Sequence, residues 1–174
     1  RPIRFAGLLL PVAAAPAPAQ VAAVVSIESD YRLRGYSLSG GDPTAAASLY
    51  YDHPGGFYAA GSAVALVDGP DLLSFQANAG FARRLSPQLT VDAGILRSEY
   101  LESSSRAAAA HYTEIYAGLA TRHFASRIYF SPDYFQSGME TLYGEVEGTT
   151  ELGRDWRLTG HLGALAYLGS APAR

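Results

Sequence analysis

The sequence predicts an all-β fold, an antiparallel up-and-down transmembrane β-barrel, and three observations favour it. First, within 71–85, Phe75 and Ala77 alternate with Gln76 and Asn78, which gives a strand one apolar and one polar face. Second, this alternation recurs along most of the chain in segments about as long as a membrane-spanning strand, ~9–11 residues. Third, 48% of the residues are hydrophobic, yet no run is long and apolar enough for a spanning helix.

Nine strands are predicted after Gln20, and all except the third are justified by an apolar stripe. In order, the strands cover 22–34, 44–52, 57–67, 71–85, 89–100, 111–121, 125–134, 141–151 and 156–168. The third carries mostly small residues on both faces. The stripes of the others contain, in order, Val25 and Ile27, Leu49 and Tyr51, Phe75 and Ala77, Val91 and Ile95, Ile115 and Leu119, Ile128 and Phe130, Leu142 and Val146, and Leu158 and Leu162.

The connections between these strands alternate in length. Those after the second, fourth, sixth and eighth strands are short, and those after the first, fifth and seventh are longer. The short connection 68–70, after the third strand, departs from this rule. Short turns at one end and long loops at the other are typical of outer-membrane barrels, so we expect 35–43 to be the first surface loop.

The first residues have the features of a secretory signal peptide. Arg1 and Arg4 are basic, 5–15 is apolar, and 17–19 has the small-residue pattern of a cleavage site. We therefore expect 1–19 to be a signal peptide and the mature chain to begin at Gln20. A Pro- and Ala-rich disordered tail is the alternative.

The predicted barrel domain, 20–174, has an odd number of visible strands. Bacterial single-chain barrels have an even number, because an open strand edge in lipid leaves backbone groups without partners. We therefore expect a C-terminal truncation, with ten to twelve strands in the complete barrel. The alternatives are a split or missed strand, or a sheet that pairs with another chain.

Composition excludes several classes of function. The chain has no cysteine, which excludes disulfides, thiolate metal sites and cysteine nucleophiles. The net charge is −3 and no basic run occurs, so nothing favours nucleic-acid binding. His111 near Ser103–Ser105 is better explained by a serine-rich loop than by catalysis, since no G-x-S-x-G motif is present. We expect neither an enzyme nor a cofactor or metal site.

Eleven titratable residues of the predicted strands fall on the faces opposite the apolar stripes. A charge at the bilayer midplane costs ~2–4 kcal/mol, so these side chains are expected to face the lumen. They either line a water-filled pore or pair across a narrow lumen and plug it. The candidate lumen-lining residues are Glu28, Asp30, Arg32, Arg34, Asp92, Glu114, Arg127, Glu145, Glu147, Arg157 and His161.

Asp30, Arg32 and Arg34 are spaced two apart, which places them on one face of the first predicted strand. Adjacent arginines repel each other and require carboxylates nearby. The alternatives for this group are a structural ladder of ion pairs and a constriction that selects solutes.

An ordered set of motifs resembles the TorF porin family, also known as the Gcw_chp domain of unknown function. The most specific is Ser29–Ser37, which reads SDYRLRGYS. In chain order, the others are Gly41-Asp42-Pro43, Ser48–Asp52 (SLYYD), Gly56-Phe57-Tyr58, Glu114–Leu119 (EIYAGL) and Ser131–Phe135 (SPDYF). The resemblance extends over about 25–168, and Ser26-Ile27-Glu28 departs from it by carrying a charge.

The resemblance implies a bacterial outer-membrane porin with the lipid bilayer and small solutes as its partners, and it supplies no catalytic residues. One alternative is a non-conducting structural or adhesion barrel whose surface loops bind partners. Another is a soluble lipocalin-like barrel, which would turn its apolar faces inward. The alternation of residues does not determine the oligomeric state.

Overall fold

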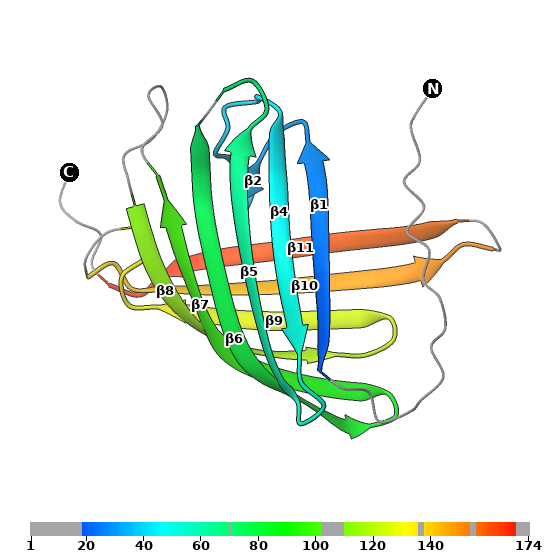
Figure 1. The fold of residues 1–174 in the computed structure, drawn as a ribbon. Helices are drawn as coiled ribbons and strands as arrows, with labels where there is room; N and C mark the ends of the chain where they lie inside the picture. Colours follow the sequence, from blue (N-terminus) through cyan, green and yellow to red (C-terminus); the bar gives the residue numbers. More distant parts are fainter. Residues whose placement is uncertain (1–18, 70, 102–109, 136–137, 154–155, 170–174) are drawn as a thin grey trace.

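The computed structural model describes residues 19–69, 71–101, 110–135, 138–153 and 156–169, and these form an all-β fold without helices (Figure 1). Nine strands build one antiparallel sheet in which each strand pairs with the next along the chain. They are β1 (Gln20–Glu28), β4 (Thr44–Asp52), β5 (Phe57–Leu66), β6 (Leu72–Ser86), β7 (Leu89–Tyr100), β8 (Ala110–Ala120), β9 (Phe124–Ser131), β10 (Thr141–Glu151) and β11 (Arg157–Tyr167). Within the described ranges, no helix has the length and apolar character needed to cross a membrane.

The first predicted strand is wrong at its C-terminal end. It was expected to continue to Arg34, but β1 ends at Glu28. The chain then folds into a small hairpin of β2 (Arg32–Leu33) and β3 (Tyr36–Ser37). Its two turn residues, Arg34 and Gly35, have φ angles of 50° and 90°, as a type I′ turn requires. The alternation of residue types continues through this turn, so residue period alone did not reveal it.

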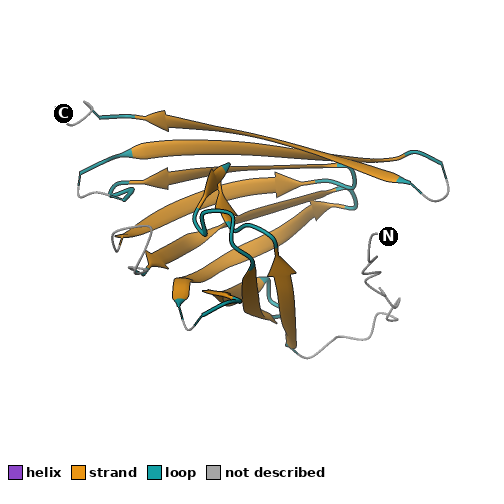
Figure 2. Ribbon diagram, turned by 90° about the horizontal axis from the view of Figure 1, so that it is seen from above, coloured by secondary structure: helices purple, strands orange, loops and turns teal. Residues whose placement is uncertain are grey.

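The sheet curls strongly, so that it has a concave and a convex face (Figures 1 and 2). The short turns after β4, β6, β8 and β10 lie at one end of the strands. The connections after β1, β5, β7 and β9 lie at the other end, and all of these except 67–71 are longer. β1 and β11 form the two edges of the sheet and do not pair with each other among the described residues. The described fold is therefore a nine-stranded curved meander that remains open between its first and last strands.

The polarity of the two faces is the reverse of that in a water-soluble sheet. Large apolar side chains are exposed on the convex face, as at Val25, which is 78% exposed, and Ile115, which is 58% exposed. Polar side chains are buried on the concave face, where Glu114 and Tyr112 are each only 1% exposed. The alternation in the sequence separated these two sets of residues correctly, and the curl places the apolar set on the outside.

Inward-facing tyrosines of the sheet lie flat against the concave wall, and glycines make room for them. A Cβ atom on Gly80 would come within 2.5 Å of the Tyr58 hydroxyl, and one on Gly94 within 2.5 Å of the Tyr116 hydroxyl. Tyr58 pairs with Gly80, and Tyr116 with Gly94, directly across neighbouring strands. Glycine is required here because only a residue without a side chain allows this close approach.

Candidate functional site

The hairpin of β2 and β3 is held together by one carboxylate. Asp30 accepts hydrogen bonds from the Ser37 hydroxyl, from the Ser39 hydroxyl at 3.1 Å and from the Gly41 amide at 3.3 Å, and it forms an ion pair with Arg32. The hydrogen bond from Ser37 lowers the pKa of the Asp30 carboxyl below its ordinary value. Asp30 thus remains ionised and fixes the conformation of the loop.

The hairpin packs on the concave side of the sheet, near the end that carries the long loops. Its contact surface is an aromatic cluster centred on Tyr112, whose ring lies 5.9 Å from that of Tyr100 and 4.7 Å from that of Tyr134. Leu33 and Leu38, which flank the hairpin turn, pack against this cluster. Burial of these apolar side chains anchors a loop that has only two residues in each strand.

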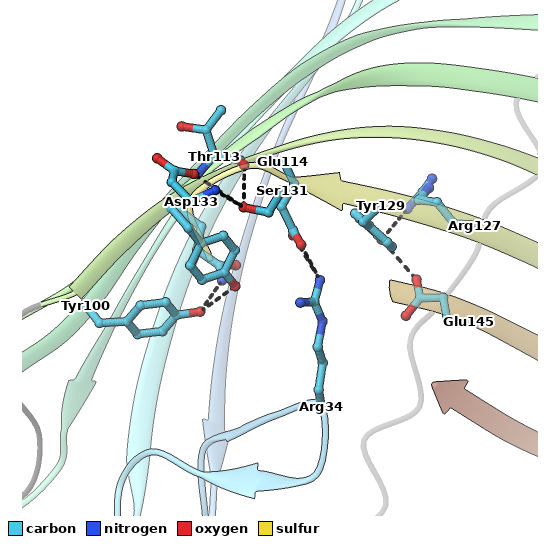
Figure 3. A network of polar contacts seen from close by, with 11 residues as sticks. Arg34, Tyr100, Thr113, Glu114, Arg127, Tyr129, Ser131, Asp133 and Glu145 are labelled. Atoms are coloured by element: carbon cyan, nitrogen blue, oxygen red, sulfur yellow. Dashed lines mark hydrogen bonds and ion pairs between the residues drawn. The ribbon is translucent and has the colours of Figure 1, made fainter. Parts of the chain in front are cut away.

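Arg34 projects from the hairpin turn towards Glu114 on the sheet (Figure 3), and both residues line one pocket. Its Nη2 donates to both carboxylate oxygens of Glu114, at 2.7 and 2.9 Å. The guanidinium carbon lies 4.0 Å from the ring centroid of Tyr143, 5.1 Å from that of Tyr134 and 5.6 Å from that of Tyr129. We call Glu114, Tyr129, Tyr134 and Tyr143 the Arg34 cage. It combines a charge-assisted hydrogen bond with stacking on aromatic faces, both of which suit guanidinium.

Arg34 is held in the cage with a strained backbone and with one guanidinium nitrogen that makes no hydrogen bond among the described residues. A φ of 50° lies in the left-handed region, which costs a residue other than glycine ~1–2 kcal/mol. The Arg34 side chain is 9% exposed, and its Nη1 is buried without a hydrogen-bond partner in the described part of the chain. Contacts in the cage therefore offset both a strained turn and an unsatisfied donor.

A second polar cluster crosses the concave wall. Asp92 accepts a hydrogen bond from the Tyr58 hydroxyl at 2.9 Å and another from Arg127 Nη2 at 2.8 Å. The Tyr58 and Tyr116 hydroxyls are 2.7 Å apart, and the Arg127 guanidinium carbon lies 5.1 Å from the centroid of the Tyr116 ring. We call Tyr58, Asp92, Tyr116 and Arg127 the Asp92 belt. All four residues belong to strands of the sheet.

A cavity of about 720 Å³ lies between the hairpin and the concave wall. Arg34 and Glu114 line it together with Glu145, which accepts a hydrogen bond from the Tyr129 hydroxyl at 2.9 Å (Figure 3). His161 also faces this space. Two carboxylates and one guanidinium therefore share the cavity, so removal of Arg34 would leave it acidic.

The structure divides the candidate residues predicted from the sequence into five groups. Arg34 and Glu114 meet in the cage, Asp92 and Arg127 meet in the belt, and Glu145, Glu147 and His161 line concave cavities. Glu28 is exposed on the edge strand β1, and Arg157 is 68% exposed with a distant partner in Glu151, 3.9 Å away. Asp30 and Arg32 pair within the hairpin.

The predicted arrangement of Asp30, Arg32 and Arg34 on a single strand face is wrong. These residues lie in a loop that turns back on itself, and Arg34 points away from the other two to reach Glu114 on β8. Sequence reasoning also missed the tyrosines of the cage. Their available signal was the placement of Tyr143 on the polar face of its strand and a glycine, Gly163, in the next strand, diagonal to Tyr143 and close to its ring.

A second feature that sequence reasoning missed is a charged pair on the convex face, although alternation places both residues on the same side of the strand as Ile95. Arg97 Nη2 lies 2.7 Å from Glu99 Oε1, and Arg97 Nη1 donates to the Thr113 hydroxyl at 3.0 Å. These residues lie near the C-terminal end of β7, towards the long loops. They show that charge is not confined to the concave face.

Within the described ranges, no group of three or more potential ligand side chains is placed to hold a metal ion. The expected signal peptide, 1–19, lies almost entirely outside the described residues, as do Ser103–Ser105.

Comparison with known proteins identifies one family. The model of the Gcw_chp family, described as a bacterial protein of unknown function, matches residues 12–168, and the chain therefore belongs to that family. Neither the curated proteins nor the solved structures that were searched gave a match.

Proposed function

We propose that this member of the Gcw_chp family is a porin-like channel of the bacterial outer membrane, through which small solutes pass or are taken up. The observation that carries the proposal is the reversed polarity of the sheet. Leu162 is 78% exposed and Ile95 is 50% exposed on the convex face, whereas Glu114 is buried on the concave face. Exposure of this much apolar surface to water is unfavourable by ~25 cal/mol per Å², whereas lipid removes the penalty.

The same observation argues against a lipocalin-like soluble barrel. Such a barrel fills its interior with the apolar side of each strand. Here the interior side carries tyrosine hydroxyls, carboxylates and arginines, as in the Asp92 belt. The resemblance of 29–37 to the opening motif of the TorF porins supports the membrane assignment.

A membrane location requires that the two edges of the sheet be paired. Unpaired backbone groups of β1 and β11 would be too costly in lipid, so these strands must meet each other or further strands in the membrane. The sequential antiparallel order of the sheet is the order found in up-and-down membrane barrels.

A non-conducting barrel is the second candidate, and the docked hairpin is the observation that favours it. The hairpin occupies part of the concave side and is fixed there by Asp30 and by Arg34. A conducting channel must leave the cavity of about 720 Å³ continuous with solvent at both ends, whereas a plugged barrel does not.

The membrane assignment is tested by two substitutions at neighbouring positions of β6. Ala79 is on the convex face opposite Ile95, and Asn78 is on the concave face opposite Leu96. For the protein refolded in lipid vesicles, Ala79→Arg should lower the free energy of unfolding by ~2–4 kcal/mol if it lies near the midplane. Asn78→Arg should cost much less, because water in the lumen solvates the charge. Equal losses in a urea titration would show that the convex face does not contact lipid.

Conduction is tested in planar bilayers with the purified, folded protein. A channel should give steady current steps in KCl, and deletion of 32–37, the hairpin, should increase the size of each step. A folded, inserted protein that carries no current with or without the hairpin would contradict the channel and leave the structural barrel.

A further inference from the structure

The Arg34 cage has the chemistry of a receptor for a planar cation. One carboxylate, that of Glu114, accepts two contacts from a guanidinium nitrogen, and three tyrosine rings surround the group. We propose that the cage is a binding site for the guanidinium group of a solute, and that Arg34 is an internal occupant which such a solute displaces. The inference rests on the proposed channel for its role in solute passage, although binding itself does not depend on conduction.

The cage and its occupant come from different parts of the fold. Glu114, Tyr129 and Tyr143 lie on β8, β9 and β10, whose register fixes their positions, and Tyr134 follows β9. Arg34 lies on a loop hairpin with two-residue strands. Withdrawal of the hairpin would therefore remove the cation and leave the receptor groups in place.

Arg34 is held incompletely, as a displaceable occupant should be. Its backbone is in the left-handed region, and its Nη1 lacks a hydrogen-bond partner among the described residues. A free guanidinium group carries no backbone strain, and it can orient itself to use more of its donors.

The adjacent cavity provides room and charge for a solute. About 720 Å³ adjoins the cage, enough for a small molecule attached to the guanidinium group. Glu145 lines this cavity with Glu114, so departure of Arg34 would leave two carboxylates facing it. Guanidinium fits better than ammonium, because a planar group can stack on Tyr143, as Arg34 does at 4.0 Å.

The first experiment measures binding by calorimetry on the full chain in detergent, with methylguanidinium as the probe and neutral methylurea as its control. Arg34→Gln should bind methylguanidinium at least about tenfold more tightly than the wild type, because the wild-type cage is free only when the hairpin has withdrawn. Methylurea should not bind. The matched control Arg83→Gln, which removes one exposed arginine from the convex face, should behave as wild type.

A second experiment keeps Arg34 and therefore remains decisive if the Arg34→Gln protein does not fold. The chain has no cysteine, so Tyr36→Cys, at an exposed hairpin position, gives a unique site for a spin label. Methylguanidinium should increase the mobility of the label, and methylurea or KCl of equal concentration should not. Glu114→Gln should weaken this response.

The outcomes separate the two proposals. No preferential binding by folded Arg34→Gln, or a label whose mobility methylguanidinium leaves unchanged, would overturn the guanidinium site even if the protein conducts. Binding by a protein that carries no current would instead retain the site and overturn the channel.

Discussion

Two arginines of this protein make almost the same kinds of contact, but one lies on a strand and the other on a loop. Arg34 pairs with Glu114 and stacks on Tyr143, and Arg127 pairs with Asp92 and lies over Tyr116. Arg127 belongs to strand β9, and its side chain is 41% exposed. Arg34 belongs to a loop, yet its side chain is only 9% exposed.

The difference shows how the curved sheet uses its strands and its loops. Strand register places Arg127 beside Asp92, so the Asp92 belt forms whenever the sheet forms. The Arg34 cage requires in addition that a loop fold inward and dock. Substitutions that break the cage and the belt separately should therefore differ in their effects on the free energy of unfolding and on the mobility of the hairpin.

The largest effect is expected from loss of the loop arginine. Arg34→Ala leaves Glu114, which is 1% exposed on a strand that cannot move it into water, as an unpaired buried charge. This should lower the free energy of unfolding by about 3–5 kcal/mol at neutral pH. Arg127→Ala should cost at most about 1 kcal/mol, since that pair is partly solvated and Asp92 keeps the hydrogen bond from Tyr58. Urea titration of the two reconstituted variants compares them, and equal losses would contradict the distinction.

Glycine substitutions should break one arrangement at a time with a smaller effect. A Cβ at Gly118 would come within 2.6 Å of Asp92 Oδ1, and one at Gly163 would collide with the Tyr143 hydroxyl. Gly118→Ala should therefore disturb the Asp92 belt, and Gly163→Ala the Arg34 cage, each at a cost of about 1–3 kcal/mol.

The matched control for both is Gly148→Ala, because a Cβ there meets nothing within 4 Å. It should leave the free energy of unfolding unchanged or slightly raised. Mobility of a label at Tyr36→Cys distinguishes the sites, since only Gly163→Ala should loosen the hairpin. A hairpin loosened equally by Gly118→Ala would show that cage and belt are coupled.

The smallest effect concerns the carboxylate that organises the loop. The pKa of Asp30 is lowered by its hydrogen bond from Ser37, so folding of the hairpin favours the ionised form. This contribution is complete above the ordinary pKa of ~3.9 and is lost as the pH falls through the lower value of the folded hairpin. Acidification should thus mobilise a label at Tyr36→Cys. In the Asp30→Asn variant, the label should be more mobile at neutral pH, and acid should not change its mobility. If acid still mobilises the label in that variant, the effect belongs to another group.

The sequence was sufficient to predict the nine strands of the main sheet, apart from the C-terminal end of the first, because alternation is a local signal. The strands over 44–52, 89–100 and 141–151 match β4, β7 and β10. The same signal assigned Asp92, Glu114 and Arg127 to the polar face, since side chains two apart in a strand share a face. It also separated Phe75 from Gln76, although the direction of the curl had to come from the structure.

The sequence was not sufficient to predict the site, because its main contact joins residues far apart in the chain. Arg34 and Glu114 meet only when a turn reverses the chain after Asp30, and the favoured residues for such a turn are Asn, Asp and Gly rather than Arg. The stacking of Tyr143 over Gly163 is likewise a cross-strand event that depends on register. The alternation of apolar and polar residues reveals neither where the chain turns nor which residues of neighbouring strands lie side by side.

The Arg97–Glu99 pair has a consequence for how the proposed barrel would sit in the bilayer. Two adjacent charges on the convex face cannot remain in the hydrocarbon region, so the height of Arg97 on β7 marks where that region must end. Lipids with longer acyl chains would pull this pair below the headgroups, and the bilayer would have to thin locally or the strands tilt less. In the proposed barrel, the pair would therefore act as a depth marker and would suit the protein to membranes of a particular thickness.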